Sequence, residues 1–118
     1  MKSDPLWVLL REYVRLRDAG QPCISCGRFY EHMDAGHYYG RGAYPNLKYD
    51  ETNIYMQCKK CNMEGNVQGM KEGIRRLYGQ KVLDDLEIKA RACTRLRKAD
   101  KKLLMVYFKQ KIKALEEK

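Results

Sequence analysis

Apolar positions near the N-terminus recur at helical spacing. Ser3 or Asp4 can cap this segment and Pro5 suits its first turn. Gly20 can end it. The spacing predicts an amphipathic helix whose buried face carries five residues, Leu6, Leu9, Leu10, Tyr13 and Leu16. Three arginines are expected to lie largely elsewhere: Arg11, Arg15 and Arg17.

The stretch from residue 20 to residue 66 is different, because it is rich in Gly, Cys, Tyr and Asn. Short strands are predicted around residues 29–38 and 53–57. Helical spacing then returns in four apolar residues, Val67, Met70, Ile74 and Leu77. Gly79 is expected to end this helix. The middle stretch is where we expect the chemistry.

Residues 80–118 contain neither Gly nor Pro, so one long helix or two helices separated near residues 98–100 would both satisfy the pattern. We favour two, with Asp100 as a cap. Apolar residues give the last helix one face, namely Leu104, Tyr107, Phe108, Ile112 and Leu115; its other face carries Lys101, Lys102, Lys109 and Lys113. Cys93 lies at helical spacing from Leu86 and Leu96, which predicts a small core residue rather than a redox or metal-binding role.

Length and charge bound the function. The 118 residues fit a single domain, with an N-terminal helix (1–20), a central unit (21–79) and a basic helical C-terminal region (80–118). The net charge of +9 points to a polyanion as partner, nucleic acid first and an acidic membrane surface second. No stretch approaches the roughly 20 apolar residues of a membrane span, and the charged N-terminus does not resemble a signal peptide. We therefore expect a cytosolic protein.

The cysteines occur in two CxxC pairs, CISC and CKKC. Four thiolates from two tight turns can close a tetrahedral zinc site, formed by Cys23, Cys26, Cys58 and Cys61. A closed site of this kind is structural and stabilises a thin core. Two disulfides or a thioredoxin-like redox pair are alternatives that fit a cytosolic chain less well. An iron–sulfur cluster is a further, minor alternative.

Between the pairs stands a histidine in the stretch MDAGHYYG (33–40). The order CxxC, His37, Asn53, CxxC-Asn is the layout of an HNH nuclease. The sequence DAGHYYGRG…ETNIYMQCKKCNMEGN, preceded by RLRDAGQPCISCGR, closely resembles the NinG/Rap family of lambdoid-phage recombination proteins, and its layout is similar to that of phage endonuclease VII. The resemblance implies a small α+β fold, in which a zinc-stapled ββα-metal (HNH, His-Me finger) nuclease unit is flanked by helices.

The resemblance also implies roles. His37 is the general base, Asn53 steadies the loop that orients its ring, and Asn62 binds a catalytic ion. The chemistry agrees, because a neutral imidazole can activate water and Mg²⁺ or Mn²⁺ takes oxygen ligands. Gly36 stands where an aspartate or histidine usually binds the ion, and Asp34 is the substitute ligand. Asn66 offers another amide oxygen, but it can equally cap the following helix.

Several residues have a plainer alternative. His37 taken alone could be a hydrogen-bonded structural histidine, and His32 is expected to face solvent. Arg41 is a candidate phosphate clamp or an ordinary surface arginine. Three tyrosines can stack on bases of an opened strand or simply pack around the zinc: Tyr38, Tyr39 and Tyr44.

A dense basic run continues toward the C-terminus: Arg91, Arg95, Arg97, Lys98, Lys101 and Lys102. It predicts a surface that follows DNA phosphates without reading bases, although such runs are often only solvated. The resemblance implies an endonuclease that cuts branched DNA such as Holliday junctions and D-loops in the host cytoplasm, with phage or host recombination proteins as further candidate partners. If junctions are cut in pairs, two active sites are needed, and a two-fold dimer would supply them. The amphipathic terminal helices could form the dimer interface, or they could pack into the core of a single chain. The alternative is a zinc-stapled DNA-binding accessory protein without catalysis.

Overall fold

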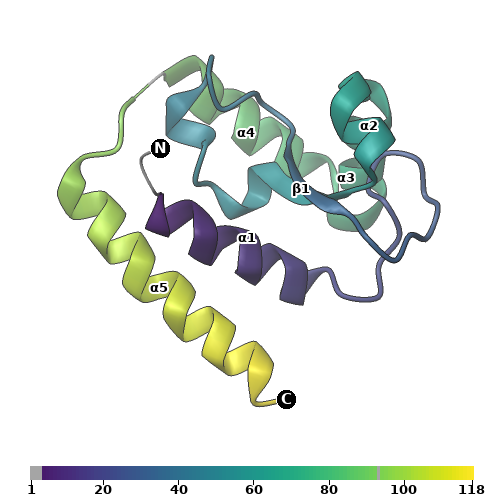
Figure 1. Cartoon of the computed structure of the whole chain (residues 1–118). Coiled ribbons are helices and arrows are strands. Elements are labelled where there is room, and N and C mark those ends of the chain that lie inside the picture. Colours follow the sequence, from purple (N-terminus) through teal and green to yellow (C-terminus); the bar gives the residue numbers. More distant parts are fainter. Residues whose placement is uncertain (1–3, 93) are drawn as a thin grey trace.

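The computed structural model describes residues 4–92 and 94–118 (Figure 1). Over these residues it is a mixed α+β protein with five α-helices and a two-stranded sheet, as predicted. Two 3-10 turns, η1 and η2, lie between the strands. The elements in chain order are α1 (Pro5–Arg17), β1 (Asp34–His37), η1 (Pro45–Leu47), η2 (Glu51–Asn53), β2 (Ile54–Gln57), α2 (Lys59–Glu64), α3 (Val67–Tyr78), α4 (Gln80–Ala92) and α5 (Lys98–Glu116).

The sheet is an antiparallel pair followed directly by a short helix. Asp34 pairs with Gln57 at one end of the ladder, and His37 pairs with Ile54 at the other. The helix α2 then packs against β1. The second strand lies within the predicted range, but the first covers only four of the ten residues expected. Residues 29–32 are exposed and lie outside the ladder.

The terminal helices pack against each other beside the sheet (Figure 1). Four residues of α1 are buried, Leu6, Leu10, Tyr13 and Val14, and they share a core with Tyr49, Ile54 and Phe108. These faces of α1 and α5 are therefore intramolecular core rather than a surface left for a partner. Leu103 and Val106 of α5 stay exposed.

The first helix ends earlier than predicted, and one of its arginines turns inward. Asp4 caps the start by accepting a hydrogen bond from the Trp7 backbone N–H at 3.1 Å; the other predicted cap, Ser3, lies outside the described residues. The helix ends at Arg17 rather than at Gly20. Arg17 pairs with Asp18 and donates to the carbonyls of Glu51 (2.8 Å) and Ile54 (2.6 Å). It therefore fastens α1 to β2 instead of lying away from the buried face.

The C-terminal half contains two helices, as favoured. The chain leaves α3 through Gly79, whose positive φ of 94° suits glycine. Helix α4 ends at Ala92 and α5 begins at Lys98, so the two helices separate a few residues before the expected position. Asp100 does cap α5, but from its third position, where its carboxylate accepts from the Arg97 backbone N–H at 2.9 Å. The prediction for Cys93 falls outside the described residues.

Candidate metal centre and histidine pocket

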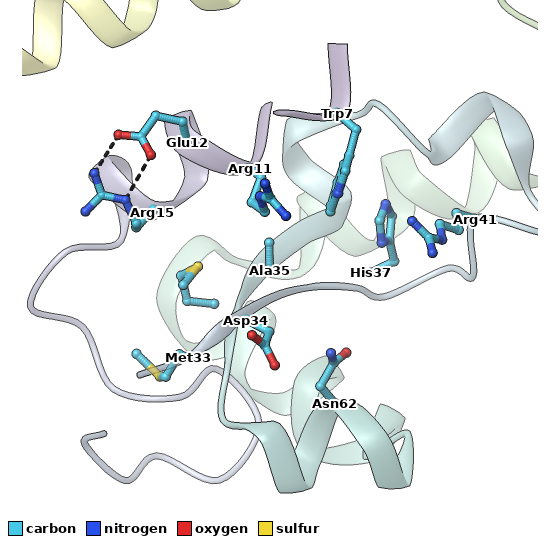
Figure 2. Close-up of a pocket in the computed structure, with 11 residues that line it drawn as sticks. Trp7, Arg11, Glu12, Arg15, Met33, Asp34, Ala35, His37, Arg41 and Asn62 are labelled. Carbon is cyan, nitrogen blue, oxygen red and sulfur yellow. Dashed lines mark hydrogen bonds and ion pairs between the residues drawn. The ribbon is translucent and has the colours of Figure 1, made fainter. Parts of the chain in front are cut away.

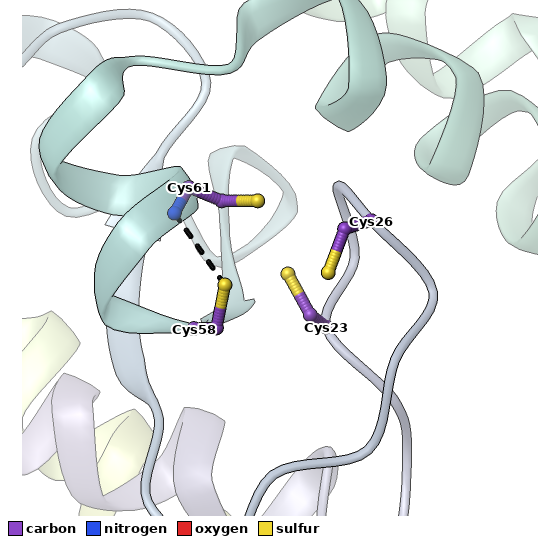
Figure 3. Close-up of side chains that lie close together, drawn as sticks. All are labelled: Cys23, Cys26, Cys58 and Cys61. Atoms are coloured by element: carbon purple, nitrogen blue, oxygen red, sulfur yellow. Dashed lines mark hydrogen bonds between the residues drawn. The ribbon is translucent and has the colours of Figure 1, made fainter.

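The four predicted cysteines come together from two distant segments (Figure 3). Cys23 and Cys26 lie on the loop between α1 and β1, whereas Cys58 caps α2 and Cys61 lies in its first turn. Their sulfur atoms all lie within 4.8 Å of one another, and none is in a disulfide. Zinc–sulfur bonds of about 2.3 Å place tetrahedral sulfurs about 3.8 Å apart, so a small contraction would seat the ion. The cluster suggests a structural zinc.

Local hydrogen bonds shape both cysteine turns. The Cys23 carbonyl accepts from the Gly27 N–H at 2.9 Å, and the Cys58 sulfur accepts from the Cys61 N–H at 3.4 Å. Burial alone would raise the pKa of Cys26, but hydrogen bonds from the Arg28 backbone and neighbouring side chains lower it to about 7. Burial raises the pKa of Cys61 to about 12. A bound cation would therefore be needed to hold the Cys61 sulfur as a thiolate at neutral pH.

Two small residues of α3 let the first cysteine turn approach closely. A Cβ on Gly73 would stand 1.9 Å from the Ile24 carbonyl oxygen, and one on Gly69 would stand 2.4 Å from that of Ser25. Larger residues at either position would push the turn outward. This contact was not predicted, although two glycines four residues apart on one helix face are a pattern that indicates close packing.

His37 ends β1 and lies in a cleft of about 430 Å³ (Figure 2). Its Nε2 is 2.9 Å from the Lys48 carbonyl oxygen. A carbonyl can only accept, so Nε2 must carry the hydrogen, which in the neutral ring leaves the Nδ1 lone pair free. The Trp7 indole stacks on the ring at 5.0 Å between centroids. The imidazole is thus held in one orientation and one tautomer.

The electrostatic surroundings keep this ring neutral. Burial lowers the pKa of His37, and the positive charges of Arg41 and Lys48 lower it further, outweighing the hydrogen bond to the Lys48 carbonyl. At neutral pH the ring is therefore an unprotonated base.

Asn53 holds the loop that carries Lys48, whose carbonyl oxygen is the hydrogen-bond partner of His37. Its side chain is fully buried and accepts from the Tyr39 N–H at 2.8 Å, while it donates to the carbonyls of Tyr39 and Leu47, each at 3.0 Å. Leu47 directly precedes Lys48, so this clasp fixes the backbone next to the oxygen that orients His37. The placement agrees with the role that the resemblance implies for Asn53.

Asp34, Asn62 and Arg41 line the same cleft as His37. Figure 2 shows Asp34 and Asn62 on one side of β1 and His37 beside Trp7 on the other. Within residues 4–92 and 94–118, the side chains of Asp34, Asn62 and Arg41 make no hydrogen bond or ion pair. The oxygens of Asp34 and Asn62 are therefore available to a metal ion, and the guanidinium of Arg41 is available to a phosphate.

The backbone of β1 explains the glycine before the histidine. A Cβ on Gly36 would stand 1.8 Å from the Gln57 Oε1 atom and 3.0 Å from the Asn62 Oδ1 atom. Gln57 is buried and donates to the Ser25 hydroxyl at 2.7 Å. The space that an aspartate or histidine side chain at position 36 would need is therefore already filled.

Asn66 is not brought to the cleft. Its Oδ1 caps α3 by accepting from the Gly69 N–H at 3.1 Å, and its amide lies 3.6 Å from the Cys61 sulfur. The alternative of a helix cap holds, and the structure gives no support to Asn66 as a catalytic ligand. His32 is exposed, as expected.

The basic run is spread over α4, the connecting segment and α5. Arg91 pairs with Glu87, and Arg97 pairs with Asp100. The exposed members are Arg91, Arg95, Arg97, Lys98, Lys101 and Lys102. None of them lines the His37 cleft, although Lys101 lines the depression next to it.

The three tyrosines pack against each other edge to face, with Tyr39 between Tyr38 and Tyr44. They cover Leu47 and Leu86 rather than the cysteine cluster. The structure therefore favours a packing role for these tyrosines, but in the core around Leu47 and Leu86 and not around the cysteine cluster.

Fold and site together define a small α+β protein in which four cysteines, placed so that they could hold a metal ion, adjoin a cleft built around an oriented histidine. A family model described as Bacteriophage Lambda NinG protein matches residues 4–118. The chain belongs to the NinG family.

Individual relatives agree. The proteins named Protein ninG of Escherichia phage 933W and Escherichia phage lambda are 35% and 34% identical to this chain, each over 95 residues. Each alignment covers 74% of the chain and 47% of the relative. The chain thus spans about half the length of the curated relatives it matches. No solved structure matches the chain. Across the described ranges, every helix is too short or too polar to cross a bilayer.

Proposed function

We propose that this protein is a metal-dependent endonuclease that hydrolyses phosphodiester bonds in branched DNA. The observation that carries the proposal is the state of His37. Its Nε2 is tied to a carbonyl at 2.9 Å, its pKa is lowered, and its Nδ1 is left open in a cleft. This is the state that a general base requires.

In the proposed reaction, the His37 Nδ1 takes a proton from the attacking water. The resulting imidazolium keeps its hydrogen bond to the Lys48 carbonyl, which becomes stronger once the ring is charged. Arg41 lines the same cleft without a partner among the described residues and offers its guanidinium to the phosphate. Trp7 and the Asn53 clasp keep the ring in place.

The oxygens of Asp34 and Asn62 fit a hard divalent ion such as Mg²⁺ or Mn²⁺, because one carboxylate and one amide leave most of the ion's water shell in place. Such an ion would neutralise charge on the phosphate and stabilise the leaving oxygen. Asn62 follows Cys61 directly, so zinc at the cysteine cluster would also fix the start of α2 and the position of this ligand.

DNA as substrate is supported by the net charge of +9 and by a neighbouring depression that shares Trp7 and Arg41 with the cleft. Lys48 and Lys101 line this depression. Lys48 is paired with Asp4, so Lys101 is the residue that would hold a phosphate on one side of the scissile bond. Branched DNA, rather than any duplex, is supported by the resemblance to phage recombination proteins. If junctions are cut in pairs, a two-fold symmetric dimer would supply the two active sites required.

The test is cleavage of a labelled four-way junction and its matched linear duplex by zinc-loaded protein, with Mg²⁺, with Mn²⁺ and with neither. We expect ion-dependent cutting of the junction that is lost in His37→Ala at unchanged zinc content. Added imidazole should restore part of the rate in this variant, because the vacated cleft admits it. A zinc-loaded His37→Ala protein that cuts as fast as the parent would refute the mechanism.

One observation favours a second function, a zinc-stapled DNA-binding protein without catalysis. Gly36 stands at the usual ion-ligand position, and Gln57 and Asn62 fill the space beside it. This alternative predicts tight junction binding by the parent and no cutting with either ion.

A further inference from the structure

A second depression, of about 380 Å³, adjoins the His37 cleft. The two share the side chains of Arg15, Met33 and Met56 as a common wall. Phe29 and Tyr30 also line the second depression. A strand held at His37 can therefore continue past Met33 to these two rings.

Phe29 is unusually exposed for its type, at 74% of its surface, and Tyr30 is exposed at 42%. Phe29 makes no ring contact with any residue in the part of the chain that the structure describes. Other aromatic residues do form such contacts, including Trp7 with His37 and Tyr55 with Tyr78. A solvated phenyl ring gains nothing for the fold, so it is available for a ligand with an apolar face.

The charges around the rings distinguish a base from a phosphate as that ligand. Asp18 and Glu31 line the depression, and Glu31 is exposed. Asp18 is buried and paired with Arg17, so the exposed Glu31 supplies the available carboxylate. This carboxylate repels phosphates, but it can accept hydrogen bonds from the amino groups of bases. Arg28, next to Phe29, and Lys60 line the neighbouring surface beyond Tyr30 and would hold the backbone.

We propose that Phe29, Tyr30 and Met33 form a stacking site for one unpaired nucleobase of the DNA strand that lies in the His37 cleft. The site rests on the proposed function, because it needs DNA in that cleft. A base in a single-stranded part of a branched DNA, such as the displaced strand of a D-loop, has no pairing partner to lose, so turning it out costs less than in a continuous duplex. The stacking site thus supplies a physical source of preference for branched DNA that contacts to phosphates cannot supply.

The test compares affinities for a short single strand and for the matched duplex, using zinc-loaded protein without Mg²⁺ or Mn²⁺. Phe29→Ala should weaken binding to the single strand by at least about fivefold and leave duplex binding nearly unchanged. Phe29→Trp should restore or exceed the parent affinity. Met63→Ala is the matched control, because Met63 is 85% exposed but lines neither depression.

A second measurement removes the base instead of the ring. One abasic residue is moved along the strand in successive oligonucleotides, and the position that weakens parent binding most marks the stacked base. At this position, the losses from the abasic residue and from Phe29→Ala should not add, because each removes the same contact.

The outcomes separate the two proposals. If the parent cuts junctions and Phe29→Ala binds the single strand as tightly as the parent does, the stacking site is overturned and the nuclease proposal stands. Fully additive losses would overturn it as well, as would a change of oligomeric state in Phe29→Ala without a change in affinity. Failure of the parent to bind any DNA would overturn both.

Discussion

Replacing Gly36 with alanine tests why this protein lacks a ligand directly before the histidine. The new methyl group would stand 1.8 Å from the Gln57 Oε1 atom, far inside van der Waals contact. Gln57 must then move, although it is buried and bonded to the Ser25 hydroxyl at 2.7 Å. The substitution therefore overpacks a buried site and breaks one side-chain hydrogen bond.

The expected cost follows from these two effects. Overpacking a core typically costs about 1–3 kcal/mol, and the lost hydrogen bond adds about 1 kcal/mol. Alanine regains about 0.5–1 kcal/mol over glycine in a strand. We expect Gly36→Ala to lower the free energy of unfolding by about 1–3.5 kcal/mol, or the melting temperature by roughly 5–15 °C for a domain of this size.

The assay is urea unfolding of zinc-loaded protein at fixed zinc concentration, in a double-mutant cycle with Gln57→Ala. Shortening Gln57 removes the obstacle, so the second substitution, Gly36→Ala, should cost nearly nothing in that background. Equal costs in both backgrounds would refute the reasoning, because the strain would then lie elsewhere than at Gln57.

Three further outcomes are expected. Arg41→Gln removes one of the positive charges that, together with burial, lower the pKa of His37. The pKa should rise, so the acid limb of the pH–rate profile for junction cleavage should move to higher pH. An unmoved limb would contradict this. Asp34→Asn should raise the Mn²⁺ concentration needed for half-maximal cleavage, whereas Glu12→Gln should not; equal effects would argue against Asp34 as ligand. Arg17→Met should cost about 2–3 kcal/mol in urea unfolding, because its bonds to the Glu51 and Ile54 carbonyls are partly buried; a change below about 0.5 kcal/mol would argue against this fastening.

The sequence predicted the parts of the site that depend on spacing along the chain. Two CxxC pairs place their thiols by local turn geometry, and the helical repeats of α1 and α3 are set by residues three or four apart. Within each pair and each helix, no knowledge of which elements meet in space is needed. The meeting of the two pairs was expected because one zinc ion takes four such ligands, and the neighbourhood of His37 was expected from the family resemblance. Spacing along the chain alone gives neither.

The features that were missed depend on such meetings. Periodicity gives the buried face of α1, but it does not show that Arg17, at the margin of this face, reaches carbonyls of β2. Trp7 stacks on His37 only because α1 crosses the sheet. The partner of His37 is the Lys48 backbone carbonyl, which every residue type possesses, so no pattern of side chains could reveal it.

The choice of ion ligand follows from what already fills the cleft. Among the described residues, two carboxylates line it, and Glu12 is committed to Arg15. Gly36 cannot carry a ligand while Gln57 occupies the space beside it. Asp34, two residues earlier on the same face of β1, is therefore the free carboxylate next to Asn62. If an ion binds in this cleft, the packing of Gln57 has moved its acidic ligand two residues along the strand while leaving the histidine in place.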